Sequence, residues 1–206
     1  MIFVGFFVAA IGVLTPGMLN LTILQLSLNE GRYQAIRFAR GAALIIFLQS
    51  IIGLSLAKYL EQNPNITENL KRIGIIIFFG LTFFFLFKGI NSKKTTKLKV
   101  LKLNTTVNRF LYGMVLSMLN LFTIPYYALI ALSLSSSSWF ELTIVSISFF
   151  ALGVGLGVYL VYSMYAIHVH KIQRKIRFLS ENVNYFIAAL TAFVALSTLI
   201  KMIIEK

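Results

Sequence analysis

Residues 11–25 read Ile-Gly-Val-Leu-Thr-Pro-Gly-Met-Leu-Asn-Leu-Thr-Ile-Leu-Gln, a break inside a long uncharged apolar run. Pro16 has no N–H group and obstructs the carbonyl group one turn earlier, and Gly17 permits non-helical backbone angles. A membrane helix tolerates such a break only where protein or a water-filled cavity satisfies the freed backbone groups. The stretch therefore predicts a broken membrane helix with a polar site beside Thr15, Pro16, Gly17 and Asn20.

A second copy of Met-Leu-Asn-Leu lies at residues 118–121, where Pro125 follows Asn120 in another apolar run. Two breaks at matching places in two halves of a chain are typical of a transporter whose site lies between its halves. The alternative is a packing kink in each helix, with each Asn bonded to a neighbouring helix. Taken as a pair, Asn20, Asn120 and Pro125 favour the site.

The composition identifies an integral membrane protein. Of the 206 residues 58% are hydrophobic and only 12% are charged, too few charges for a soluble globule of this size. The net charge of +13 does not indicate a nucleic-acid binder, because the basic residues lie in short strips between apolar segments. The chain has no Cys, which excludes disulfides and thiolate metal sites.

The spacing of charges predicts six membrane helices, with the N-terminal one as a mature span rather than a signal peptide. Basic residues near the shorter intervals would reach the headgroup region. The predicted spans are residues 1–29, 41–57, 73–87, 110–140, 142–167 and 182–200.

The distribution of basic residues predicts the orientation. Fourteen of the 19 Lys and Arg residues fall in segments 30–40, 88–109 and 168–181, which the positive-inside rule places in the cytoplasm as loops. Both termini are then outside. The basic segment 91–109 is interpreted as a linker between two halves, and the alternative is that it lies along anionic lipid headgroups.

This linker divides a single polytopic membrane domain, residues 1–206, into two halves, residues 1–90 and 110–206. Three spans in each half make the second half enter the membrane in the opposite direction, which is the condition for an inverted repeat. The predicted fold is an all-α membrane protein of two inverted three-helix halves, with its first and fourth helices broken by proline.

Gln49 is the third polar candidate because it lies in the middle of the second span, where an unsatisfied amide costs a few kcal/mol. A hydrogen bond between helices and a role in substrate binding both remain open for it. Gly153 and Gly157 indicate close helix packing rather than a dinucleotide loop. A stripe of tyrosines is interpreted as core or interface, and a pair of histidines as headgroup-level residues rather than a metal site: Tyr159, Tyr162 and Tyr165; His168 and His170.

The distribution of carboxylates excludes several mechanisms. The chain has no Asp, and its six Glu residues lie in the predicted loops or at the ends of spans. No mid-membrane carboxylate relay for protons is present, and no constellation for intramembrane proteolysis. We therefore expect no enzyme activity, no catalytic residue, no metal and no cofactor.

The stretch from Leu14 to Gln49 resembles the LysE/RhtB family of amino-acid exporters, small six-helix proteins of the bacterial inner membrane. Thr15-Pro16-Gly17 is similar to the family's Thr-Pro-Gly-Pro motif, and Asn29-Glu-Gly31-Arg32 resembles the turn that opens the first cytoplasmic loop, with Gly41 following in the second helix. The Met-Leu-Asn120 segment resembles the family's Leu-Leu-Asn-Pro-Lys region, although Leu121 and Phe122 replace Pro and Lys, and Gln49 stands where His is common.

The resemblance implies a secondary transporter that exports a small amino acid or related metabolite. Because the spans lack buried charges, we expect a neutral or zwitterionic substrate, held at mid-membrane by Asn20, Asn120 and Gln49 and by backbone freed near Gly17 and Pro125. The alternatives are a non-transporting scaffold or partner subunit and a passive channel. A homodimer is plausible for so small a bundle.

Overall fold

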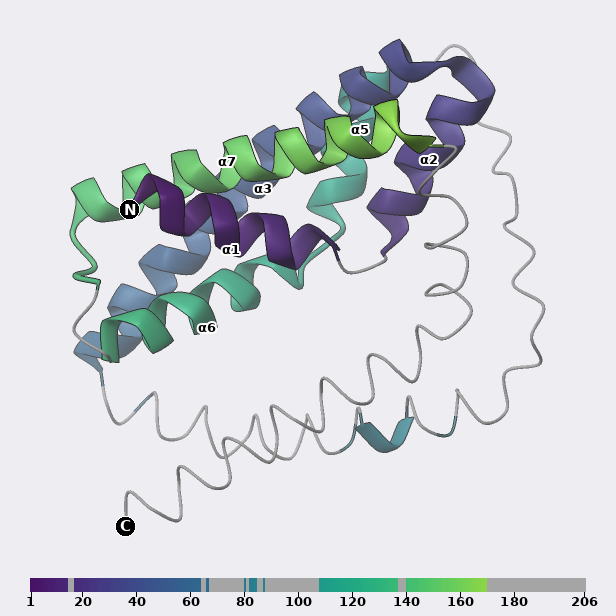
Figure 1. Cartoon of the computed structure of the whole chain (residues 1–206). Helices are drawn as coiled ribbons and strands as arrows, with labels where there is room; N and C mark the ends of the chain where they lie inside the picture. Colours follow the sequence, from purple (N-terminus) through teal and green to yellow (C-terminus); the bar gives the residue numbers. More distant parts are fainter. Residues whose placement is uncertain are drawn as a thin grey trace. The chain divides into compact units, whose positions relative to one another are not determined.

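The computed structural model describes residues 1–14, 17–63, 66, 80, 82–84, 87, 108–136 and 140–169, and the regular secondary structure among these residues is helical. The structure separates into two units, Met1–Tyr59 with Val100–Ile176 and Leu60–Lys99 with Arg177–Lys206. Figure 1 shows the helices discussed below. Apart from the last residues of α3 (Arg32–Gln62), these helices belong to the first unit. The expectation of an all-α membrane protein is thus confirmed over the described part of the chain.

Side-chain caps mark the start of two helices. The Asn108 side chain accepts a hydrogen bond from the Phe110 N–H at 3.0 Å, and the Thr143 hydroxyl accepts one from the Ser146 N–H at 3.2 Å. Each cap satisfies a backbone donor that has no partner within its own helix. The longer helices are α1 Ile2–Leu14, α2 Met18–Glu30, α3 Arg32–Gln62, α5 Arg109–Met118, α6 Thr123–Ser136 and α7 Ile144–Ile167.

Four of the predicted spans have counterparts among the described helices. Helices α3 and α7 are long and apolar enough to cross a membrane, and the count rises to four if each bent pair, α1–α2 and α5–α6, is one span. The two members of these pairs are inclined by 77° and 63°, respectively. Predicted span 182–200 and most of span 73–87 lie outside the described residues.

The predicted loop at residues 30–40 is wrong, because only Gly31 separates α2 from α3. Its φ of 88° lies in the left-handed region that favours glycine, so the chain turns there in a single residue. Residues 32–40 continue as helix because Arg, Ala and Gln are good helix formers, and charges beyond the hydrocarbon region do not interrupt a helix. The 31 residues of α3 measure about 46 Å, well beyond the roughly 30 Å of a hydrocarbon core.

The bend between α5 and α6 occupies residues 119–122. The Leu119 N–H still donates to Val115 O at 3.2 Å, but the Asn120 N–H reaches back only to Ser117 O, at 3.0 Å. Pro125 lies beyond the bend, as the third residue of α6. A proline there loses no helical hydrogen bond, while its ring opposes a helical path through the carbonyl of the residue four positions earlier. The break thus precedes Pro125, and Pro16 lies outside the described residues.

Helices α1 and α7 run parallel and pack closely through glycines. A methyl group on Gly5 would overlap the carbonyl oxygen of Phe150, and one on Gly153 would overlap the carbonyl oxygen of Ile2. Gly157 faces the Phe6 backbone in the same way, so the expected close packing at Gly153 and Gly157 is confirmed.

Helices α3 and α5 repeat this arrangement. A methyl group on Gly113 would overlap the carbonyl oxygen of Phe38, and one on Gly41 would overlap the carbonyl oxygen of Phe110. In both pairs, the facing phenylalanine lies three residues before the glycine of its own helix: Phe38 before Gly41, as Phe150 before Gly153. Small residues let membrane helices approach this closely. The same four-residue contact therefore occurs twice in the unit.

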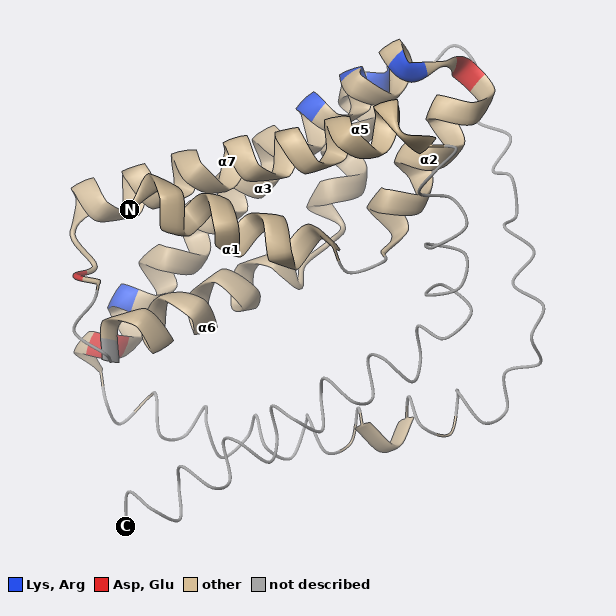
Figure 2. Ribbon diagram, viewed as in Figure 1, with Lys and Arg blue, Asp and Glu red and all other residues tan. Residues whose placement is uncertain are grey.

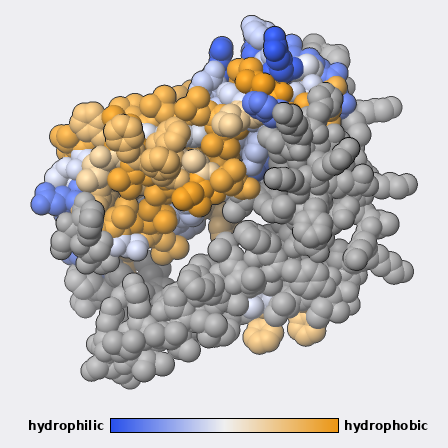
Figure 3. Space-filling model, viewed as in Figure 1, coloured by the Kyte–Doolittle hydropathy of each residue, from blue (hydrophilic) through white to orange (hydrophobic). Residues whose placement is uncertain are grey.

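Charge and hydropathy divide the described surface into an apolar middle and polar ends. Four arginines gather near one end, here called the basic end, with Glu30 beside them (Figure 2). The described surface in between is mostly apolar (Figure 3), with large side chains such as Phe3 and Ile144 each 77% exposed. Such exposure suits a surface that faces lipid rather than water. The arginines of the basic end are Arg32, Arg37, Arg40 and Arg109.

Candidate functional site

Asn20 caps the carbonyl group at the end of the preceding half-helix. Its Nδ2 donates to Val13 O at 2.8 Å, across the break between α1 and α2, and the residue is only 2% exposed. Gly17 begins α2 with extended angles, φ −138° and ψ 178°, and no side chain caps this helix. No atom lies within 4 Å of a Cβ placed on Gly17, so space is open there. Thr15 and Pro16 lie outside the described residues.

Gln49 performs the equivalent task at the second break, although it comes from another helix. From the middle of α3 its Nε2 donates to Ser117 O at 3.2 Å and, more weakly, to Asn120 O at 3.4 Å. These carbonyls lie where the α5 ladder ends, and Gln49 is 6% exposed. The structure thus brings Gln49 and Asn120 together, through the backbone of Asn120.

Asn120 is exposed, whereas Asn20 is buried. The two copies of Met-Leu-Asn-Leu are consequently used differently: Asn20 caps a helix with its side chain, whereas Asn120 contributes a carbonyl oxygen to Gln49. Pro125 lies in the first turn of α6, just beyond this contact.

Tyr126 connects the two broken spans and was not predicted. Its hydroxyl donates to Val8 O in α1 at 3.1 Å, and a methyl group on Gly12 would lie 2.9 Å from that hydroxyl. The first turn of α6 therefore lies against the last turns of α1, close to the break that follows Leu14. A tyrosine directly after a helix-starting proline was the available signal, because a phenol in an apolar span needs a polar partner.

Three buried side-chain oxygens have no hydrogen-bond partner within the described ranges: Gln49 Oε1, Ser117 Oγ and Ser163 Oγ. The orientation of the Gln49 amide follows from its partners. Both are carbonyl oxygens, which only accept, so the NH₂ group must face them and Oε1 must face elsewhere. Two acceptors without donors, Gln49 Oε1 and Ser117 Oγ, thus lie beside the second break. Sequence reasoning did not identify Ser117.

The tyrosines of α7 belong to the hydrophobic core or pack against it, and His168 follows the helix. Tyr162 and Tyr165 are buried in the hydrophobic core and Tyr159 packs against it, so the core interpretation of this stripe is confirmed. His168 is exposed at the end of α7, with Nδ1 3.2 Å from Met164 O, while His170 lies outside the described residues. Among the described residues no group of three or more His, Asp or Glu could hold a metal ion.

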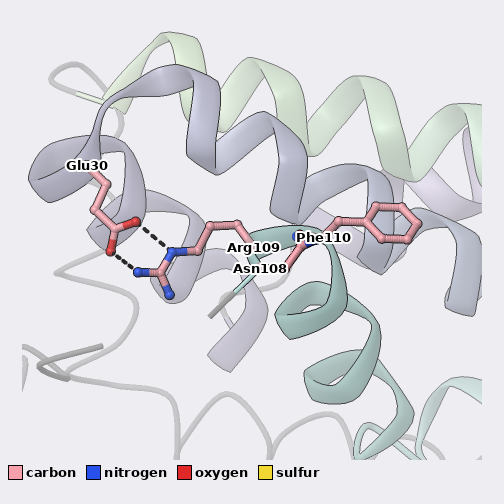
Figure 4. A network of polar contacts seen from close by, with 4 residues as sticks. All are labelled: Glu30, Asn108, Arg109 and Phe110. Atoms are coloured by element: carbon pink, nitrogen blue, oxygen red, sulfur yellow. Dashed lines mark hydrogen bonds and ion pairs between the residues drawn. The ribbon is translucent and has the colours of Figure 1, made fainter. Parts of the chain in front are cut away.

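A buried ion pair joins α2 to α5 at the basic end (Figure 4). Arg109 Nε and Nη2 donate to the two Glu30 carboxylate oxygens at 2.6 and 2.7 Å, and Arg109 is only 3% exposed. Glu30 ends α2 and Arg109 begins α5, so each charge lies at the unfavourable end of its own helix dipole. The pair therefore compensates two local penalties across the boundary between the predicted halves. The sequence alone suggested only two loop charges.

Comparison with known proteins adds an independent finding. No curated protein and no solved structure matched the chain. A family model described as LysE type translocator, however, matches residues 10–202, nearly the whole chain. The resemblance noted in the sequence is thereby confirmed, and the transport function that it implies excludes an enzyme. The chain belongs to the LysE type translocator family and is a multi-pass membrane transporter.

Proposed function

We propose that this protein is a secondary transporter that exports a small neutral or zwitterionic amino acid, or a related metabolite, across the bacterial inner membrane. One observation carries the proposal: two broken membrane helices meet at Tyr126, and a buried amide caps the end of the first half of each. Broken helices that converge inside a membrane are the usual frame of a transporter site.

The surroundings of this frame favour a substrate without net charge. In the broken helices the only described charged residues are Glu30 and Arg109, and each lies at the helix end away from the break. A zwitterion supplies both of its own charges. The uncapped start of α2 at Gly17 suits a carboxylate, because backbone N–H groups and the helix dipole favour an anion there.

The seven sequence candidates divide between frame and contact in this proposal. Asn20 and Gln49 hold the half-helix ends in place with their NH₂ groups, while Gln49 Oε1 stays available as an acceptor. The exposed Asn120 amide offers a donor and an acceptor. Backbone groups beside the two breaks complete the site, with Thr15, Pro16, Gly17 and Pro125 as the residues concerned.

The repeated glycine contact supports two inverted halves. Gly113 follows Gly5 by 108 residues (113 minus 5), and Gly153 follows Gly41 by 112 (153 minus 41). The first span of one half therefore meets the second span of the other half twice, as an internal two-fold axis requires. In this frame Asn20 and Asn120 are not equivalent, because only 100 residues separate them. Transport would proceed by rocking of one half against the other.

Orientation and partners complete the proposal. Both termini are placed outside, the basic linker 91–109 faces anionic headgroups in the cytoplasm, and a homodimer is the proposed assembly. Family membership disfavours a non-transporting scaffold. A passive channel differs from a transporter in that its flux does not saturate with substrate.

A metabolite-export assay tests the function. Cells that overproduce or lack the protein are loaded with dipeptides of each amino acid in turn, and the external amino acid is measured over time. We expect faster, saturable efflux of one or a few small neutral amino acids in the overproducing cells. A variant with Asn20→Leu and Asn120→Leu, present at the same level in the membrane, serves as the inactive control. Identical efflux from both strains for every amino acid would refute the proposal.

A further inference from the structure

Gln49 and Ser117, which meet at the second break, each carry a buried acceptor that has no partner among the described residues. Gln49 Nε2 binds Ser117 O at 3.2 Å, which places the rest of the amide next to Ser117. Gln49 Oε1 and Ser117 Oγ are both buried, and within the part of the chain that the structure describes neither has a hydrogen-bond partner. Ser117 is 0% exposed and Gln49 6% exposed, so lipid headgroups and bulk water do not reach them in this structure.

Leaving such groups unsatisfied inside a membrane costs free energy, so an occupant that satisfies them is favoured. The amide oxygen can only accept, and the hydroxyl can also accept. The complementary occupant therefore brings positive charge or N–H donors. Because neither predicted span 41–57 nor predicted span 110–140 contains a carboxylate, these spans supply none of the anionic ligands that calcium and magnesium usually take.

We propose that Gln49 Oε1 and Ser117 Oγ form a binding site for a small monovalent cationic group beside the α5–α6 break. The group is either a sodium ion or the ammonium group of the substrate, and the inference rests on the proposed transport function. Unwound helix ends and neutral oxygens hold coupling ions in other transporters with broken helices.

The site supplies a route to coupling that needs no proton carrier. The chain contains no Asp, and none of its Glu residues falls in the middle of a predicted span. If one cluster takes the ammonium group in one direction and a sodium ion in the other, exchange follows from competition for the same oxygens. In this proposal Ser117 and Gln49 determine which cation the transporter binds.

Ser117→Ala is the decisive variant, because Ser117 Oγ makes no hydrogen bond with any described residue, so its loss removes a proposed ligand without removing an observed bond of the fold. Ser163→Ala is the matched control: Ser163 Oγ is also buried without a partner among the described residues, but it lies within α7, a helix that has no break. Both variants should elute as monodisperse protein with the wild-type melting temperature.

Binding of radiolabelled sodium and of radiolabelled methylammonium is measured separately on purified full-length protein, with no amino acid present. We expect Ser117→Ala to weaken binding of at least one probe about tenfold to a hundredfold, the loss typical of one hydrogen bond to a charged group. Ser163→Ala should leave both affinities unchanged. If Ser117→Ala weakens the binding of sodium alone, the site holds a coupling ion. If it weakens the binding of methylammonium alone, the site holds the ammonium group of the substrate. If it weakens both and the two probes compete, the site serves exchange.

If neither probe binds, or if Ser117→Ala and Ser163→Ala bind both probes like the wild type, the site is wrong and the two acceptors hold water only. That result leaves the proposed function intact, because it is measured by efflux. Conversely, cation binding that depends on Ser117, in a protein that exports no amino acid, supports the site and refutes the proposed function.

Discussion

At the scale of single residues, the buried side-chain amides of Asn20 and Gln49 stabilise the backbone of the broken helices, in addition to any role in binding substrate. Asn20 Nδ2 and Gln49 Nε2 both donate to carbonyl oxygens at half-helix ends. In lipid these carbonyls have no water to bind, so each amide makes its break tolerable. The packing and site interpretations that the sequence left open are therefore compatible in Gln49, whose NH₂ group caps the break while its buried Oε1 has no partner among the described residues.

The two asparagines should respond differently to Leu substitution. Asn20→Leu removes a buried donor from Val13 O and should lower the free energy of unfolding by about 1–3 kcal/mol. Asn120→Leu changes an exposed side chain and should alter it by less than about 0.5 kcal/mol. Melting temperatures of the purified variants in detergent measure the contrast. Equal destabilisation would contradict the distinct placements.

Gly17→Ala should fold normally. Its φ of −138° is ordinary extended backbone, and no atom lies within 4 Å of the added methyl group. We expect an unchanged melting temperature and at least a severalfold loss of efflux, because the open space at the start of α2 is the proposed place of the substrate carboxylate. Normal efflux at normal stability would exclude substrate from this space.

At the scale of helices, the glycine contacts between α1 and α7 and between α3 and α5 repeat one arrangement. Gly5→Ala and Gly113→Ala should therefore destabilise the protein by similar amounts, at least about 1–3 kcal/mol each, because each methyl group meets a carbonyl oxygen. Thermal unfolding of both variants, with Gly17→Ala as the control without a clash, measures this. A large cost at only one position would argue against equivalent halves.

The ion pair between α2 and α5 predicts an unusual response to charge reversal. Glu30→Gln removes the carboxylate that pairs with the buried Arg109 and should cost on the order of 3 kcal/mol, the lower part of the range for buried pairs, since the Glu30 side chain is 21% exposed. Glu30→Arg combined with Arg109→Glu restores the pair and also places each charge at the favourable end of its helix dipole. The double variant should therefore regain at least most of the wild-type stability.

Melting curves of the wild type, Glu30→Arg, Arg109→Glu and the double variant form a complete double-mutant cycle for this pair. Arg109→Lys is the matched control, because lysine keeps the charge and loses the two parallel bonds. A double variant as unstable as the sum of the single variants would show that the interaction does not join α2 to α5 energetically.

At the scale of the whole molecule, the absence of cysteine makes the orientation directly measurable. Tyr33→Cys and Gln62→Cys place single thiols on exposed residues near opposite ends of α3. A membrane-impermeant maleimide should label Gln62→Cys in intact cells and Tyr33→Cys only after permeabilisation, because the positive-inside rule places the arginine-rich end in the cytoplasm. The reverse pattern would invert the predicted orientation.

The sequence predicted the membrane class, the family and four of the described spans, because apolar length and charge spacing act locally. It could not predict that Gln49 serves the α5 break, since this contact joins residues 68 positions apart and depends on how α3 packs. The prediction of a loop at residues 30–40 was wrong for a different reason. Three arginines suggested a loop, whereas helix propensity continues the helix outside the hydrocarbon region.

Helix α3 is long enough for a small tilt about Gln49 to displace its ends measurably. At about 1.5 Å per residue, Gln49 lies about 26 Å from the Arg32 end and about 20 Å from the Gln62 end. Tilting a rod of these dimensions by about ten degrees around Gln49 displaces the Arg32 end by roughly 4 Å. If an occupant at the break causes a tilt of this size, the arginine-rich end moves far enough for a distance probe at Tyr33 to detect.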